Sequence, residues 1–290
     1  MSDTPAEKYS IVLVIRPFSH HADAQYNNID RFLDIGMVTY EKFLNKEDLQ
    51  EFFVIVPKAD VTSVQKRLQD AYPSWPWRVI NEDNLLHASI PPGWARQQTV
   101  KLAVSALVRT PTYLIIDDDT YLTKPLSISD MRDPTSGKLL MNRTEIDFPF
   151  FFLWSAQVLE ADFDMVQDQP CHMAITPEIF VTQVVRDLVK HLVDKYGSAK
   201  EWQVFLVNNK YTEYCLYWIW LLMQNKHNEL YDTITQKQLY GYATTGMEHD
   251  MSTQVKLSFQ ENANHYFSFV QSSLPISVTD IKQAVISQLQ

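Results

Sequence analysis

The chain has 290 residues, of which 46% are hydrophobic and 21% are charged, and these fractions are typical of a globular protein that buries a sizeable core. The formal net charge of −10 at pH 7 argues against nucleic acid as the main partner, because no surplus of basic residues is present to displace counterions from phosphates. We expect one domain over residues 1–290, with a first half at about 9–125 and a second half at about 126–290.

Two features of the sequence bear on the compartment in which the protein works. Cys171 and Cys215 are the only cysteines, too few for a disulfide framework in a chain of this length. The apolar segment 11–15 is too short for the core of an export signal, and the segment 214–223 is shorter than the roughly 20 residues that a membrane span needs. We therefore expect a cytoplasmic protein, or one from another reducing compartment, without a membrane span.

The first part of the chain alternates apolar runs with amphipathic segments. Runs rich in branched and aromatic residues predict strands at 11–15, 52–56, 77–80 and 113–116. Segments of helical periodicity predict the intervening helices at 29–43, 61–72 and 94–108. Because buried strands alternate with helices, the crossovers should be right-handed and the sheet mostly parallel. The expected fold class is therefore a doubly wound α/β structure.

Beyond residue 122 this alternation breaks down. Segments 139–141, 148–153 and 172–175 predict strands of a mixed sheet, and helices are expected from residue 177 to about 225. The sequence Thr176-Pro177-Glu178 has the features of a helix start, with a capping hydroxyl, proline at the first helical position and an acid in the first turn. A second helix start, similar to a capping box, is expected from Ser277.

Three acidic residues, Asp117, Asp118 and Asp119, follow the fourth predicted strand directly in the sequence YLIIDDDTYLTKPL. Ligands of open α/β sheets bind outside the carboxyl ends of the strands. Adjacent carboxylates repel one another, and a bound cation removes that repulsion. In an extended segment Asp117 and Asp119 point the same way and can hold Mg²⁺ or Mn²⁺, with a diphosphate completing the shell. An acidic turn without a ligand is the plainer alternative.

An apolar strand followed by Asp-x-Asp, after an α/β half of this length, resembles the DXD motif of GT-A glycosyltransferases. GWARQQTVKL before the strand, TKPL after it, and TPEIF, TEYCLYW and HYFSFVQS later in the chain extend the resemblance from about residue 93 to residue 272. Together these segments are similar to a family of GT-A-like proteins from bacteria and large viruses. The resemblance implies a GT-A-like fold, with a nucleotide-sugar-binding first half and a mixed-sheet and helical second half on the acceptor side.

The function that this resemblance implies is metal-dependent glycosyl transfer, from a UDP- or GDP-sugar to a hydroxyl group of a glycan or other acceptor, with inversion at the anomeric carbon. A retaining reaction is the alternative within the class. A nucleotide-sugar-binding module that has lost turnover is a second possibility. The third is an aspartate-nucleophile phosphatase, but its motif reads Asp-x-Asp-x-Thr on the first strand, whereas here Thr120 follows Asp119 directly on the fourth.

Four residues are candidates for contacts to the donor. Arg16 ends the first strand and Asp83 follows the third, so both open toward the crevice where GT-A proteins hold the base and ribose. Salt-bridged strand ends are the alternative for both. On the helix at 94–108, Gln97 and Lys101 lie within about 60° of Trp94. The family resemblance makes Gln97 and Lys101 candidates for donor contacts, with Lys101 on a phosphate or sugar, although both could be ordinary helix-surface residues.

Residues late in the chain are candidates through the resemblance alone. GT-A enzymes often bring a late histidine or aspartate to the metal, which makes His265, in the predicted strand HYFSFVQS, the candidate third metal ligand. His172 is its competitor for that role. Gln271 and Ser272 are candidates for hydrogen bonds to the diphosphate.

Glu213 lies near the start of the predicted helix in YTEYCLYWIW. An acid at such a helix start deprotonates the acceptor hydroxyl in inverting GT-A enzymes, so Glu213 is the candidate catalytic base and Asp118 is the next. An acid that only interacts with the helix dipole is the alternative for Glu213. Tyr211, Tyr214 and Trp218 could stack on sugar rings, although aromatic residues at helical spacing more often belong to the core.

Overall fold

The structure is a computed structural model of the chain. It describes residues 7–16, 28–87, 89–142, 149–162, 173, 175–198, 201–233, 238–244, 250–260, 263–271, 274 and 276–290. The candidate residues His172 and Ser272 lie outside the described residues, as does Cys171.

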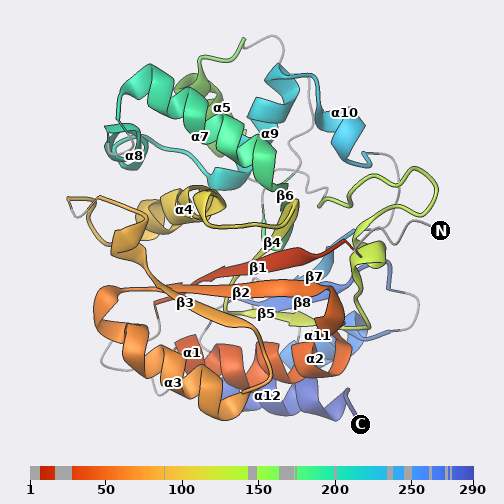
Figure 1. Ribbon diagram of the computed structural model, residues 1–290. Helices are drawn as coiled ribbons and strands as arrows, with labels where there is room; N and C mark the ends of the chain where they lie inside the picture. The colour runs from red at the N-terminus through yellow and green to blue at the C-terminus, as the bar shows by residue number, and fades with distance from the viewer. Residues whose placement is uncertain are drawn as a thin grey trace, which may run out of the picture.

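A five-stranded sheet in the order β3-β2-β1-β4-β6 forms the centre of the molecule (Figure 1). Its strands are β1 (Tyr9–Val14), β2 (Leu49–Val56), β3 (Trp77–Asn81), β4 (Thr112–Ile116) and β6 (Glu178–Val181). The first four run parallel to their neighbours, and β6 is antiparallel to β4. The four predicted strands and the mostly parallel α/β sheet are thus confirmed. The carboxyl ends of β1 to β4 meet at one edge of this sheet.

Helices cover both faces of the large sheet (Figure 1). On one face lie α1 (Asn28–Arg31), the π-helix η1 (Phe32–Gly36), α2 (Met37–Phe43) and α3 (Val61–Ala71). On the other lie α4 (Trp94–Ala103), α7 (Thr182–Tyr196), α8 (Glu201–Val207) and α9 (Glu213–Met223). Short helical turns are η2 (Lys46–Asp48), η3 (Lys58–Asp60), η4 (Glu82–Asn84), η5 (Val104–Ala106) and η6 (Ile128–Met131).

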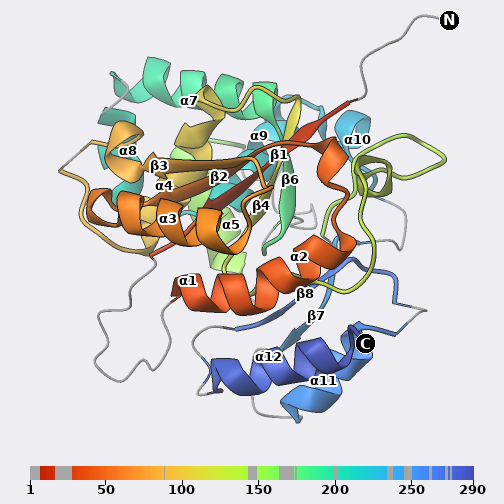
Figure 2. The same ribbon diagram turned by 60° about the horizontal axis from the view of Figure 1, so that its bottom comes forward.

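A second, three-stranded sheet has the order β5-β8-β7, with β5 (Thr120–Leu122), β7 (Tyr240–Thr244) and β8 (Phe267–Val270). The helices α11 (Met251–Ser258) and α12 (Val278–Ser287) accompany it (Figure 2). The strand predicted in HYFSFVQS is therefore confirmed. The helix start at Ser277 is confirmed too, because its hydroxyl accepts hydrogen bonds from the amides of Thr279 and Asp280.

Two predictions for the second half are wrong. The segment predicted as a strand at 148–153 is helix α5 (Pro149–Leu159), which packs against α9. Its sequence PFFFLWSAQVL is apolar almost throughout, and a run of that kind fits a buried strand or a buried helix equally well. Leu139 makes only isolated bridges, to Arg132 and Tyr231, in place of the strand predicted at 139–141.

A third prediction is also wrong, because the helix expected from Pro177 begins five residues later, at Thr182. Residues Glu178–Val181 form β6, which pairs with Thr112 to Ile115 of β4, and α7 follows from Thr182. The open edge of β4 therefore overrides the local helix-start signal. The short helix α10 (His227–Leu230) completes the elements. None of the helices in the described ranges has the length and apolar character that would let it cross a membrane.

Candidate active site

The acidic turn lies at the carboxyl end of β4, directly beside β1. The chain moves from β1 outward through β2 to β3 and then returns to place β4 on the other side of β1. Such a reversal of strand order is where open α/β sheets bind ligands. Two contacts of the Thr120 hydroxyl fix the turn. It donates to the Asp117 carbonyl oxygen over 2.8 Å, and it lies 2.8 Å from the Tyr40 hydroxyl of α2.

A close helix approach holds the same turn in place. A Cβ atom on Gly36, at the end of η1, would lie 3.0 Å from the Thr120 carbonyl oxygen, so a side chain would push the helix and the turn apart. The Thr39 hydroxyl accepts a hydrogen bond from the Leu122 amide over 2.9 Å. The position of the acidic turn is therefore determined by its packing against η1 and α2.

Lys101 of α4 joins two carboxylates beneath this turn. Its ammonium nitrogen lies 3.0 Å from Asp117 Oδ1 and 3.0 Å from Glu213 Oε1, and only 2% of its side chain is exposed. The Tyr214 hydroxyl lies 3.4 Å from the same nitrogen. Burial alone would lower the pKa of Lys101, but Asp117 and Glu213 outweigh it and raise that pKa well above its ordinary value. Lys101 is therefore a charged partner of the acids, and its ammonium is buried.

Glu213 is the first residue of α9, as predicted, and its side chain is 0% exposed. The Thr212 hydroxyl caps the helix by accepting from the Cys215 amide over 3.0 Å. With its NH₂ group turned toward Glu213, the Gln98 amide donates to the same carboxylate. Burial raises the pKa of Glu213, and Lys101 opposes this rise. An acceptor hydroxyl could reach Glu213 only after these contacts open, so the role of Glu213 as a base remains a prediction.

Asp118 points away from its neighbour, toward α1. Its Oδ2 atom lies 3.6 Å from Arg31 Nη1, whereas Asp117 faces Lys101 of α4 on the other side of the sheet. The pKa of Asp118 is raised to about 6, because burial outweighs the opposing effect of Arg31 and Asp117 adds to the rise. Asp118 therefore carries a carboxyl group that titrates closer to neutral pH than an ordinary aspartate does.

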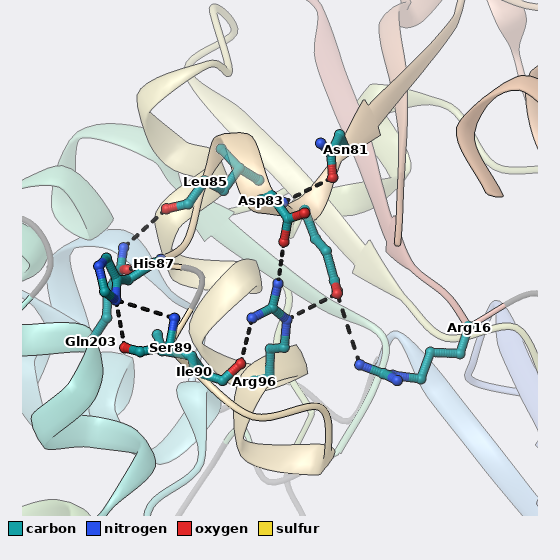
Figure 3. Close-up of polar contacts among 10 residues, drawn as sticks. Arg16, Asn81, Asp83, Leu85, His87, Ser89, Ile90, Arg96 and Gln203 are labelled. Carbon is teal, nitrogen blue, oxygen red and sulfur yellow. Dashed lines mark hydrogen bonds and ion pairs between the residues drawn. The ribbon is translucent and has the colours of Figure 1, made fainter. Parts of the chain in front are cut away.

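A buried arginine organises the polar residues at the carboxyl end of β3 (Figure 3). Arg96 of α4 donates to Glu82 over 2.9 Å, to Asp83 over 2.7 Å and to the Ile90 carbonyl oxygen over 2.7 Å. Arg16, at the end of β1, approaches Glu82 at 3.8 Å. Arg16 and Asp83 are thus both in ion pairs, as expected if they are salt-bridged strand ends. Even so, 39% of the Arg16 side chain and 43% of the Asp83 side chain stay exposed.

Sequence reasoning missed Arg96 and Glu82 in this network. The available signal was the pair of adjacent acids at the end of β3, which needs a cation nearby once it is partly buried. Gln97, next to Arg96, donates to the Val14 carbonyl oxygen at the end of β1 over 2.8 Å. Gln97 therefore ties α4 to the sheet.

His265 is not brought to the acidic turn. Thr120 pairs with Phe269 in the small sheet, and the Val270 amide donates to the Asp119 carbonyl oxygen over 3.3 Å. From Phe269 back to His265 the chain covers four residues, roughly 13 Å if extended. Burial, with a smaller contribution from Lys124, lowers the pKa of His265 to about 4. We therefore leave His265 out of the metal site, whereas Gln271, which follows Val270, lies at the Asp119 end of β8.

The divalent ion expected on Asp117 and Asp119 remains a prediction. Within the described ranges, no group of three His, Cys, Asp or Glu side chains is placed to hold a metal. Mg²⁺ commonly uses one or two carboxylates and takes its other ligands from water and substrate phosphates. The side chain of Asp117 remains 29% exposed beside Lys101. The turn and its surroundings also hold two more acidic than basic groups, counting Asp117, Asp118, Asp119 and Glu213 against Lys101 and Arg31.

The aromatic residues suggested as sugar platforms belong to the core. Tyr211, Tyr214 and Trp218 are all buried. The Tyr211 hydroxyl donates to the Ala95 carbonyl oxygen over 2.9 Å, which joins the start of α9 to α4. These rings therefore present no face to a substrate in this structure.

The mostly parallel sheet with its flanking helices is similar to the folds of solved glycosyltransferases. The apo crystal structure of mouse xyloside xylosyltransferase 1 matches with a TM-score of 0.54 and 10% identity, over 93% of this chain and 100% of that one. The apo structure of the bifunctional glycosyltransferase WbbM matches with a TM-score of 0.53 and 10% identity, over 98% of this chain and 50% of that one. At such identity these likenesses establish the fold alone.

The chain belongs to the family described as a family of unknown function, DUF6492, whose model matches residues 6–289. None of the curated proteins compared with the sequence matches it.

Proposed function

We propose that the protein is a metal-dependent glycosyltransferase that moves a sugar from a nucleoside-diphosphate sugar to a hydroxyl group of a glycan or other acceptor. The observation that carries this proposal is the position of Asp117 and Asp119. They follow β4 where the strand order of a GT-A-like sheet reverses, at the edge where such sheets bind ligands. The phosphatase alternative loses support, because its motif belongs to a different strand.

The donor would lie along the carboxyl edge of the large sheet. Its base and ribose would face Arg16 and Asp83, which are ion-paired but still exposed. Its diphosphate would lie near Asp117, Asp119 and Gln271. UDP and GDP remain equal candidates for the nucleotide.

A Mn²⁺ or Mg²⁺ ion on Asp117 and Asp119 would stabilise the negative charge that develops on the departing nucleoside diphosphate. The residues of the chain supply the setting for this chemistry. Lys101 holds the Asp117 carboxylate through its Oδ1 atom, and Thr120 holds the backbone of the turn. We expect these contacts to hold the carboxylate and the backbone of the turn in place before the donor arrives, and such preorganisation lowers the reorganisation needed during reaction.

For the acceptor side, Glu213 remains the proposed base and Asp118 the second candidate. A direct attack with such a base gives inversion, whereas a retaining reaction needs no dedicated base. The burial of Glu213 also favours, as a second function, a module that binds nucleotide sugars without turnover. Slow hydrolysis of a nucleotide sugar by the purified protein with Mn²⁺ would exclude that module.

Calorimetric titration with UDP and GDP, in Mn²⁺ and in EDTA, tests the proposed donor site. We expect binding in Mn²⁺ only, and its loss in Asp119→Asn without a change in the melting temperature of the ligand-free protein. Asp70→Asn, which removes an exposed carboxylate on α3, serves as the matched control. Equal affinity in Mn²⁺ and EDTA would refute the proposal.

A further inference from the structure

Four aromatic side chains form a partly exposed cluster, here called the aromatic patch: Trp94, Phe150, Phe151 and Trp154. The Trp94 ring centroid lies 5.5 Å from that of Phe151. Phe150 lies 4.9 Å from both Phe151 and Trp154, and Phe151 lies 5.6 Å from Trp154. The patch thus joins the first turn of α4 to the first half of α5.

The exposure of this patch is unusual for the molecule. Trp94 is 51% exposed and Phe150 is 39% exposed, and among the described residues the third exposed large hydrophobic side chain is Val204, on α8. By contrast, the aromatic residues of α9 are buried in the core. Contiguous exposed apolar surface on a soluble domain marks a binding site more often than chance.

The aromatic patch lies beside the proposed active site. Trp94 precedes Lys101 by seven residues, which on a helix is about 10 Å along the axis and on the same face. Lys101 in turn contacts Asp117. From the other side, the Thr212 amide donates to the Ser155 hydroxyl over 3.3 Å, which links α5 to the residue that precedes Glu213. Helices α4, α5 and α9 lie on one side of the large sheet (Figure 1).

The chemistry of the patch favours a carbohydrate. Its members are aromatic, and an aromatic ring has a negative face that attracts the polarised C–H groups on one face of a sugar ring. The hydroxyl rim of a sugar needs polar groups at the margin, and Lys210 supplies one, with its Nζ atom 4.3 Å from the Trp154 ring centroid. Membrane interfaces also favour tryptophan and phenylalanine, so a membrane is the occupant that the test must distinguish from a glycan.

We propose that the aromatic patch is an acceptor subsite, where Trp94 and Phe150 stack on a sugar ring of a glycan. Because the patch lies about two helical turns from Lys101, the stacked ring is a neighbour of the accepting sugar and not the accepting sugar itself. This inference rests on the proposed function, and it names its acceptor as an oligosaccharide.

The test uses the full chain with Mn²⁺ and UDP or GDP, and the disaccharides cellobiose, lactose, maltose and mannobiose as probes in saturation-transfer NMR. We expect at least one disaccharide to bind the parent. Trp94→Phe should retain this binding, whereas Trp94→Leu and Phe150→Ala should weaken it about three- to tenfold. Val204→Ala, at an exposed apolar position outside the patch, is the matched control and should bind like the parent.

Nucleoside diphosphate binding, measured on the same samples, separates the two proposals. If the parent binds UDP or GDP but none of the disaccharides, the acceptor subsite is refuted and the proposed function stands. Parent-like binding by Trp94→Leu also refutes stacking, because leucine keeps the apolar surface and loses the ring. Recruitment to phosphatidylethanolamine and phosphatidylglycerol vesicles that Phe150→Ala abolishes would assign the patch to a membrane instead. If the parent binds neither a nucleoside diphosphate nor a disaccharide, both proposals are refuted.

Discussion

Replacing Lys101 with methionine tests the buried ion pairs beneath the acidic turn. Each of its two contacts spans 3.0 Å, and at an effective dielectric constant of about 20 that distance corresponds to roughly 5 kcal/mol of Coulomb attraction per pair. Desolvation of the three groups offsets much of this attraction. The substitution leaves Glu213 buried without its cation, so we expect a loss of about 3–5 kcal/mol of unfolding free energy at pH 7. That is a large share of the total stability of a typical domain.

The double variant Lys101→Met with Glu213→Gln makes this prediction falsifiable. The second substitution removes the uncompensated charge. The double variant should therefore lose about 2 kcal/mol less unfolding free energy than the sum of the two single losses. Urea unfolding followed by circular dichroism measures all four free energies. Lys190→Met breaks an exposed pair with Asp194 and should lose less than about 1 kcal/mol. Additive losses, or a loss in Lys101→Met no larger than in this control, would refute the reasoning.

Three further predictions concern single acids and a histidine. Because burial raises the pKa of Asp118 from 3.8 to about 6, the folded protein binds a proton that the unfolded chain releases, and the parent loses stability as the pH rises between these values. Asp118→Asn should therefore gain roughly 3 kcal/mol relative to the parent between pH 4 and pH 7, in urea titrations with EDTA present. The pKa of His265 is lowered from 6.5 to about 4, so the parent loses stability as the pH falls through this range. His265→Gln should remove roughly 3 kcal/mol of that acid sensitivity and leave Mn²⁺-dependent UDP or GDP affinity unchanged, whereas weaker affinity would return His265 to the metal site. Glu213→Gln should keep Mn²⁺-dependent nucleotide binding and lose about 10²- to 10⁴-fold in turnover, which is the range for a positioned base. A turnover rate like that of the parent would make Asp118 the next residue to test.

The first half of the fold could be predicted because β1, β4 and most of β2 are buried, whereas β3 is only partly buried. Continuous runs such as residues 52–56 have no other common interpretation when helices of ordinary length separate them. The second half of the fold could not be predicted, because tertiary interactions decide which of its segments become helices and which become strands. Helix α5 is set by its packing against α9, and β6 is set by the open edge of β4. Neither partner is visible in the local sequence.

The candidate site shows the same division. Because ligands bind at the carboxyl ends of parallel strands, the sequence predicted that Arg16, Asp83, Asp117 and Asp119 lie at one edge of the sheet. The structure places the ends of their strands at that edge. The partners of these residues depended on geometry that no spacing reveals. Lys101 turns inward only because Glu213 enters from α9, more than a hundred residues later. His265 depended on the register of β8, which the sequence left open.

The contacts of Glu213 also separate two ways in which this acid can act. A base must come within about 2.6–3.2 Å of the hydroxyl proton it removes, but Glu213 has no exposed surface while Lys101 and Gln98 engage it. A base role therefore requires these contacts to open when the acceptor binds, whereas a positioning role, in which Glu213 shares Lys101 with Asp117, requires them to stay closed. The stereochemistry of the product distinguishes the two. Inversion together with a slow Glu213→Gln variant demands an opened Glu213, inversion at the parent rate in that variant points to Asp118, and retention leaves the buried pair intact as the support of Asp117.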